Sequence, residues 1–146
     1  GLGVFLAETE IDARKYLDTF NKQNIKYLIQ EYISESKGKD VRAFVVGGKV
    51  VAAMKRTAPE GEFRSNIHRG GVGMNIELTQ EETDLVVKTA KVMNLSVCGV
   101  DLLQSDRGPL ILEVNSSPGL EGIERYTQVD VAGSIMEYME QKLANS

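Results

Sequence analysis

Two pairs of short apolar segments, each pair joined by a turn, limit most strongly how this chain can fold. The pairs are residues 41–46 and 49–54 around Gly47-Gly48, and residues 97–104 and 109–115 around a short polar turn. Two adjacent glycines tolerate the positive φ angles of a tight hairpin turn, and both pairs have strand composition. The sequence therefore predicts two antiparallel hairpins, and not the strand–helix–strand units that build a parallel sheet.

Helical patterns lie between and around these hairpins. Residues 11–23 place their apolar side chains roughly on one face, which predicts a helix. Thr79 and Glu82 have the spacing of a capping box, which opens a second helix that ends near Met93. Asp130 can cap a last helix. The expected fold class is α+β.

Two further segments carry weaker patterns. Residues 25–33 are rich in β-branched and aromatic side chains, which favours a strand. Residues 57–76 lose all periodicity and contain several glycines, which predicts a loop. A loop of this length inside a compact domain is usually functional or disordered.

Composition excludes several classes of function. The 146 residues carry a net charge of −4, which disfavours a broad electrostatic grip on nucleic acid. Cys98 is the one cysteine and His68 the one histidine, so an internal disulfide and a zinc site rich in these residues are excluded. No apolar run approaches the ~18 residues of a membrane-spanning helix. We expect a cytoplasmic protein that does not bind a membrane.

Carboxylates in the middle of apolar strands are the sharpest chemical signal. Asp101 lies in one strand of the second hairpin, and Glu113 and Asn115 lie two residues apart in the other. Residues two apart share a face of a strand, so the three oxygen donors converge if Asp101 lies opposite Glu113. Such hard oxygen ligands suit Mg²⁺. The alternative is that both carboxylates are structural and face solvent or pair with Lys or Arg.

A basic, glycine-rich stretch is the second signal. Between residues 55 and 73 the chain carries four cations and two acidic residues: Lys55, Arg56, Arg64 and Arg69, with Glu60 and Glu62. The planar fork of arginine suits phosphate and carboxylate groups, and glycines allow a loop to close over an anion. The alternative is a solvated basic loop without a ligand.

Five segments, taken in order, resemble a known family. They are Gln30-Glu31-Tyr32-Ile33, residues 38–47, residues 63–71 with Arg64-Ser65-Asn66, Gly99-Val100-Asp101, and residues 112–123 with Glu113-Val114-Asn115-Ser116-Ser117-Pro118-Gly119. In this order they resemble the C-terminal part of the ATP-grasp carboxylate–amine ligases, above all the RimK-type ribosomal-protein glutamate ligases. The resemblance covers essentially the whole chain and implies an ATP-grasp fold of antiparallel or mixed sheets with flanking helices.

The resemblance also implies roles for individual residues. The metal ligands for one or two Mg²⁺ or Mn²⁺ ions on the ATP phosphates are Asp101, Glu113 and Asn115. The nucleotide-binding residues are Glu31, Tyr32 and Ile33 at adenine, Asp40 at the ribose, and Arg64, Ser65 and Asn66 at the phosphates and the reacting carboxylate. The catalytic residues are Arg64 and Arg56.

In such ligases a carboxylate attacks the γ-phosphorus of ATP, and an amine then displaces phosphate from the acylphosphate. The RimK resemblance implies that the carboxylate is the C-terminus of a small-subunit ribosomal protein and that the amine is L-glutamate. It also implies a homo-oligomer for the full-length protein. Two alternatives stay open: a ligase that acts on a free amino acid or small peptide, and a non-catalytic module whose basic loop binds a protein or RNA.

The resemblance further implies a domain division and a truncation. Residues 1–46 correspond to the rest of the N-terminal subdomain with the adenine-binding hinge, and residues 47–146 to the C-terminal subdomain with the metal site. The family also has an upstream subdomain, whose lysine reaches the α- and β-phosphates, and the chain opens without an initiator Met. We therefore expect a fragment truncated at its N-terminus, with little or no activity alone.

Overall fold

A computed structural model describes residues 3–61 and 70–145. The chain divides into two compact units, Gly1–Ser34 and Glu35–Ser146, and each is considered separately. The assignment of residues 1–46 and 47–146 to two ATP-grasp subdomains stays a prediction.

The described residues of the first unit form the helix α1 (Glu10–Lys22), where the sequence predicts it. The side chain of Thr9 caps it by accepting the backbone N–H of Asp12 at 3.1 Å. Its aromatic side chains join a cluster in which the ring centroids of neighbours lie 5.2–6.4 Å apart: Phe5, Tyr16, Phe20 and Tyr27. Aromatic contacts therefore organise this unit.

The strand predicted over residues 25–33 is wrong, because these residues form neither strand nor helix. Their composition favours a strand, but a strand also requires a neighbour on which to form a hydrogen-bonded ladder. The one sheet of the described residues does not include them.

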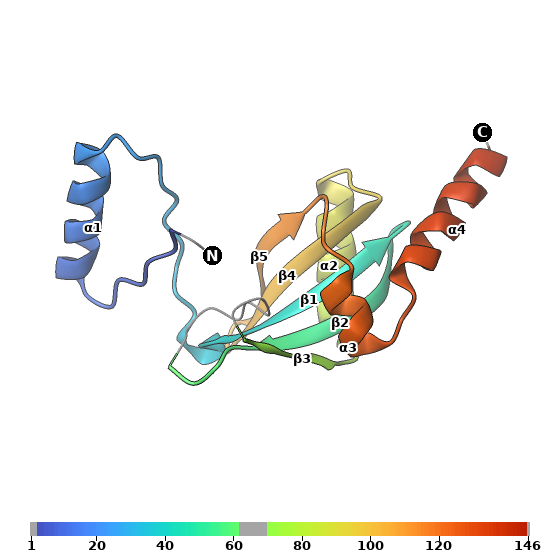
Figure 1. The fold of residues 1–146 in the computed structure, drawn as a ribbon, viewed down its shortest axis with the longest axis horizontal. Helices are drawn as coiled ribbons and strands as arrows, with labels where there is room; N and C mark the ends of the chain where they lie inside the picture. The colour runs from blue at the N-terminus through green and yellow to red at the C-terminus, as the bar shows by residue number, and fades with distance from the viewer. Residues whose placement is uncertain (1–2, 62–69, 146) are drawn as a thin grey trace. The chain divides into compact units, whose positions relative to one another are not determined.

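The second unit is built on a five-stranded antiparallel sheet with the order β3-β2-β1-β4-β5 (Figure 1). The strands are β1 (Lys39–Val46), β2 (Lys49–Thr57), β3 (Val72–Asn75), β4 (Val97–Ser105) and β5 (Gly108–Asn115), and a short 3-10 helix, η1 (Ser34–Ser36), precedes them. Both predicted hairpins are present, as β1–β2 and β4–β5. The α+β fold class is confirmed.

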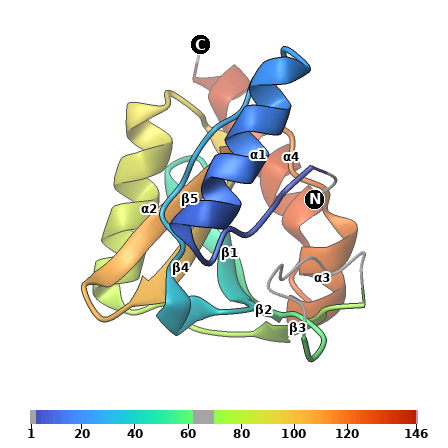
Figure 2. The same ribbon diagram turned by 90° about the vertical axis from the view of Figure 1, so that its left-hand side faces the viewer.

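Helices cover both faces of this sheet (Figure 2). The helix α2 (Gln80–Val92) packs on one face, and α3 (Glu121–Thr127) and α4 (Val131–Ala144) pack on the other. Alternate residues of β1 supply the two cores: Val45 lies in the cluster under α2, and Phe44 lies in the cluster under α3 and α4.

The predicted helix starts are confirmed. Thr79 and Glu82 form a reciprocal capping box, with the Thr79 hydroxyl accepting from Glu82 N and the Glu82 carboxylate accepting from Thr79 N. Asp130 accepts the backbone N–H of Gly133 at 2.7 Å at the start of α4. Each cap satisfies a backbone donor that the first turn of a helix leaves without a partner.

Glycine is required in the β1–β2 turn and in the edge strand β3 for different reasons. Gly47 and Gly48 both have positive φ angles, 59° and 78°, as the tight turn between β1 and β2 requires. Gly73 of β3 has no positive φ, but a Cβ placed there would lie 2.6 Å from Cγ of Tyr126 in α3. The absence of a side chain therefore lets α3 pack closely on the edge of the sheet.

Two elements were not predicted. Strand β3 pairs with β2 inside the segment expected to be a loop, and no helix was expected where α3 lies. No helix among the described residues combines the length and the apolar content that crossing a bilayer requires.

Candidate functional site

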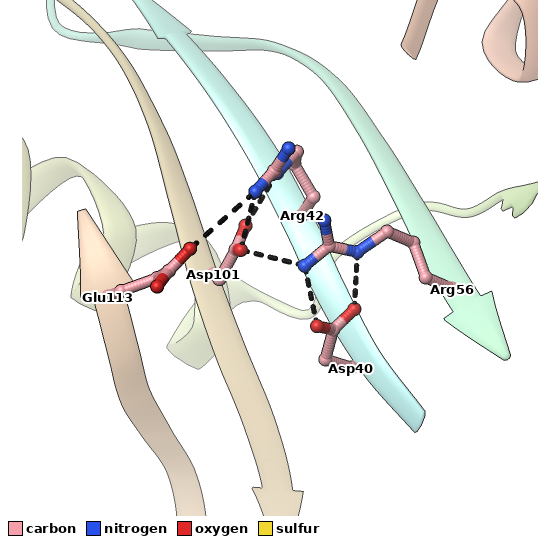
Figure 3. A network of polar contacts seen from close by, with 5 residues as sticks. All are labelled: Asp40, Arg42, Arg56, Asp101 and Glu113. Atoms are coloured by element: carbon pink, nitrogen blue, oxygen red, sulfur yellow. Dashed lines mark hydrogen bonds and ion pairs between the residues drawn. The ribbon is translucent and has the colours of Figure 1, made fainter. Parts of the chain in front are cut away.

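The sheet face that α3 and α4 cover at one end is polar at the other (Figure 3). Five charged side chains meet there, and they come from four adjacent strands: Asp40 and Arg42 from β1, Arg56 from β2, Asp101 from β4 and Glu113 from β5. Asp40, Arg42 and Phe44 alternate with apolar residues of β1, so they share the face that Phe44 occupies. The same strands therefore build an apolar core and a charged cluster side by side.

Register places the predicted metal ligands together. Asp101 of β4 lies directly opposite Glu113 of β5, and Gly99 lies opposite Asn115. Asp101 and Gly99 share a face of their strand, so the side chain of Asn115 is on the same face as both carboxylates. The expected convergence of Asp101 with Glu113 is confirmed.

A bulge in β5 lies beside this carboxylate pair. Asp101 pairs with Glu113, but the next residue, Leu102, pairs with Ile111, so Leu112 is left out of the register. A bulge re-aims the neighbouring side chains and increases the local twist of the strand. Here it allows Ile111 to pack on the core under α2 while Glu113 faces Asp101.

Arg42 binds the carboxylate of Asp101 with two parallel hydrogen bonds. Its Nε donates to Oδ1 at 2.7 Å and its terminal NH2 nitrogen donates to Oδ2 at 2.6 Å. The same nitrogen lies 3.8 Å from Oε1 of Glu113, at the outer limit of an ion pair. Arg42 therefore bridges the two facing carboxylates.

Arg56 binds two carboxylates from the other side. It donates to both oxygens of Asp40, at 2.6 and 2.5 Å, and to Oδ2 of Asp101 at 2.7 Å. Asp40 and Arg56 are directly opposite each other in the β1–β2 ladder. Each of these side chains is nearly buried, and a buried charge is tolerated only when it is paired in this way.

The cluster shifts the pKa values of its members in opposite directions. Burial by itself raises the pKa of Asp101, but the hydrogen bonds and charges of Arg42 and Arg56 outweigh it and lower the pKa below the usual range. Burial and the neighbouring Asp101 charge raise the pKa of Glu113. Burial opposes the charge of Arg56, but Asp40 and Asp101 raise its pKa further above the ordinary value.

The donor set fits a hard divalent cation. Two carboxylates face each other and an amide oxygen lies on the same face, which is the chemistry that Mg²⁺ selects. Among the described residues no group of three or more His, Cys, Asp and Glu side chains could hold a metal ion, and the expected set of two carboxylates and the amide of Asn115 stays a prediction. The pairing with arginine that the structural alternative expects is present as well, because Asp101 is bound by Arg42 and Arg56.

The other predicted site residues have different positions. Asp40 is 5% exposed and bound by Arg56, so its expected contact with a ribose stays a prediction. Glu31, Tyr32 and Ile33 belong to the first unit, and their expected role at adenine also stays a prediction. Arg64, Ser65 and Asn66 lie outside the described residues.

Arg42 is the member of the cluster that was not predicted from the sequence. Its signal is the one that identified Asp101, a charged residue in the middle of an apolar strand. What the sequence lacks is the pairing of β1 with β4, which places Arg42 opposite Asp101 across 59 residues of chain.

The cluster occurs in a chain whose relatives are known. A family model described as a RimK-like ATP-grasp domain matches residues 1–139. A protein of Picosynechococcus sp. named "Probable alpha-L-glutamate ligase" is 58% identical over 144 residues, which cover 99% of this chain and 48% of that protein. One of the same name from Saccharophagus degradans is 57% identical over 140 residues, which cover 96% of this chain and 46% of that protein. The chain thus spans about half the length of these curated relatives.

Solved structures show the same fold. A Chryseobacterium gregarium RiPP-associated ATP-grasp ligase, in complex with ADP and a leader and core peptide, has a TM-score of 0.69 at 19% identity, over 95% of this chain and 43% of that one. The ATP-grasp ligase PsnB, complexed with a precursor variant, Mg and ADP, has a TM-score of 0.62 at 26% identity, over 78% of this chain and 34% of that one. Family match, relatives and fold agree, and the chain belongs to the RimK-like ATP-grasp domain family.

Proposed function

We propose that this chain provides nucleotide- and metal-binding residues of an ATP-dependent carboxylate–amine ligase that adds L-glutamate to the C-terminus of a small-subunit ribosomal protein. The observation that carries the proposal is the Asp101–Glu113 pair, with Asn115 on the same face, in a chain 58% identical to a protein named "Probable alpha-L-glutamate ligase". The Mg²⁺ and ADP held by PsnB support ATP with Mg²⁺ as the cofactors, and Mn²⁺ is the alternative cation of the proposal.

In this proposal Asp101, Glu113 and Asn115 hold the cation. The cation supplies charge that offsets the negative charge developing on the phosphates. Arg56, fixed between Asp40 and Asp101, and Arg64 add positive charge for the phosphates and the reacting carboxylate. Ser65 and Asn66 contact the same groups, Asp40 the ribose, and Glu31, Tyr32 and Ile33 the adenine.

The reaction needs no covalent protein nucleophile. An acceptor carboxylate oxygen bonds to the γ-phosphorus as its bond to ADP breaks, which gives an acylphosphate. The glutamate amine then bonds to the acyl carbon, loses a proton, and releases phosphate. Positioning and positive charge supply the catalysis. This agrees with Cys98, which is fully buried and whose pKa burial raises, as expected for an inert thiol.

Glutamate-dependent release of ADP tests the proposal. We expect a protein extended to the length of its relatives to release ADP with glutamate and a peptide ending in the ribosomal-protein C-terminus, and much less with lysine or aspartate. Glu113→Gln should lower the rate by at least about a hundredfold, because it removes charge from the metal site. Glu140→Gln, on the exposed side of α4, is the matched control.

The same assay separates the alternatives. Equal rates with a free amino acid or short peptide as acceptor would favour a small-molecule ligase, and no turnover with any acceptor would favour the non-catalytic module. We expect the 146-residue chain itself to release ADP far more slowly than the longer protein, and equal rates would contradict its proposed fragment nature. In the same proposal, the full-length protein is cytoplasmic and homo-oligomeric.

A further inference from the structure

Arg42 occupies both oxygens of the central metal ligand. Its guanidinium binds the Asp101 carboxylate through two donors, one on Oδ1 and one on Oδ2 (Figure 3). The proposed ligand oxygens are therefore already bound by a protein cation. A divalent ion and a guanidinium compete for the same lone pairs.

Arg56 is not equivalent to Arg42 in this respect. Both of its forked donors bind Asp40, and it gives a single hydrogen bond to Asp101. Its charge is therefore matched by Asp40, its direct neighbour in the β1–β2 ladder. The counter-ion of Asp101 is Arg42.

The fold holds Arg42 in this position. Its side chain is 16% exposed, and that of Asp101 is 2% exposed. A Cβ on Gly99 would lie 3.9 Å from Arg42 Nε and 3.0 Å from Cβ of Pro118, so glycine leaves the space between them. Arg42 Nε and Pro118, in the loop that follows Asn115, thus both lie beside Gly99 of β4.

We propose that Arg42 is a resident counter-cation of the metal site, which keeps the affinity for a free divalent cation low in the absence of nucleotide. This inference rests on the proposed function, because it assumes that Asp101 and Glu113 are metal ligands. Like charges a few ångströms apart in a nearly buried site repel strongly, so the cation binds only as the guanidinium yields an oxygen of Asp101.

A nucleotide relieves this competition because it brings its own anions. Guanidinium groups bind phosphate oxygens through the same two-donor geometry with which Arg42 binds Asp101. When phosphates accept the donors of Arg42, Asp101 becomes available to the cation. Arg42 thereby links tight cation binding to the presence of nucleotide.

Binding of Mn²⁺ by this chain without nucleotide, followed by electron paramagnetic resonance, tests the proposal. Arg42→Gln removes the competing charge and should tighten Mn²⁺ binding by at least about tenfold. Arg42→Lys keeps the positive charge but binds fewer carboxylate oxygens, so the affinity of this variant for Mn²⁺ should lie between those of the wild type and Arg42→Gln.

The double variant Arg42→Gln/Glu113→Gln should lose the increase in Mn²⁺ affinity, which would assign that increase to this site. Thermal unfolding checks each variant, and Arg42→Lys alone still tests the ordering if Arg42→Gln does not fold.

Addition of ADP should tighten Mn²⁺ binding by the wild-type chain much more than by Arg42→Gln, because the variant has no competing charge to release. If Glu113→Gln abolishes Mn²⁺ binding but Arg42→Gln binds Mn²⁺ no more tightly than the wild type, the proposed role of Arg42 is wrong. The proposed metal site would then be retained. Absence of Mn²⁺ binding in every variant, with and without ADP, would overturn the metal site of the proposed function itself.

Discussion

At the scale of single residues, the candidate site is a balance between three carboxylates and two guanidinium groups. Asp101 is at its centre, since both arginines donate to it and Glu113 faces it. That Asp101 is a candidate metal ligand could be predicted from the position of a carboxylate in an apolar strand. Its pairing with Arg42 could not, because that contact depends on a ladder between strands far apart in the sequence.

The lowered pKa of Asp101 makes a prediction for stability against pH. Its folded-state pKa lies below the unfolded value of about 3.9, so its contribution to stability is fully present above about pH 5 and is lost as the pH falls toward the folded-state pKa. At pH 7, with a chelator present, Asp101→Asn should lower the free energy of unfolding by about 3 kcal/mol, because two arginines lose a buried partner.

Urea unfolding of both proteins from pH 7 to pH 3 checks this. The difference between wild type and Asp101→Asn should be constant above about pH 5 and should shrink by about 1 kcal/mol at pH 3. A difference that stays constant over the whole range would mean that ionisation of Asp101 does not stabilise the fold.

At the scale of elements, patterns among residues close in the sequence predicted hairpins and helix starts correctly. Elements that depend on contacts between distant segments were not predicted. The β1–β2 hairpin and the capping box of α2 depend on residues a few positions apart, and both were readable from the sequence. Strand β3 has four residues including Gly73, and it exists because β2 offers an edge. Residues 25–33 have strand composition but form no strand, because composition does not supply a hydrogen-bonded partner.

The contact between β3 and α3 gives a prediction for this scale. Gly73→Ala places a methyl group against the ring of Tyr126 and should lower the free energy of unfolding by about 1–3 kcal/mol through overpacking. Gly119→Ala is the control, because nothing lies within 4 Å of its added Cβ. Equal stability of the two variants in urea unfolding would show that the sheet edge adjusts to the ring.

At the scale of the whole molecule, the fold agrees with the family, because solved ATP-grasp ligases share it. The Chryseobacterium gregarium ligase that shares the fold is only 19% identical to this chain, so that likeness supports the architecture and no substrate. The position of the charged cluster on the sheet is therefore what links this fold to the proposed chemistry.

Calorimetry of Mg²⁺-ADP binding to this chain tests the central claim most directly. We expect binding that requires Mg²⁺, is abolished by Glu113→Gln, and is retained by Glu140→Gln on α4. The reason is that Glu113 faces Asp101 across the β4–β5 ladder and supplies half of the carboxylate pair. Binding that survives Glu113→Gln, or that is unchanged when Mg²⁺ is removed, would contradict the account.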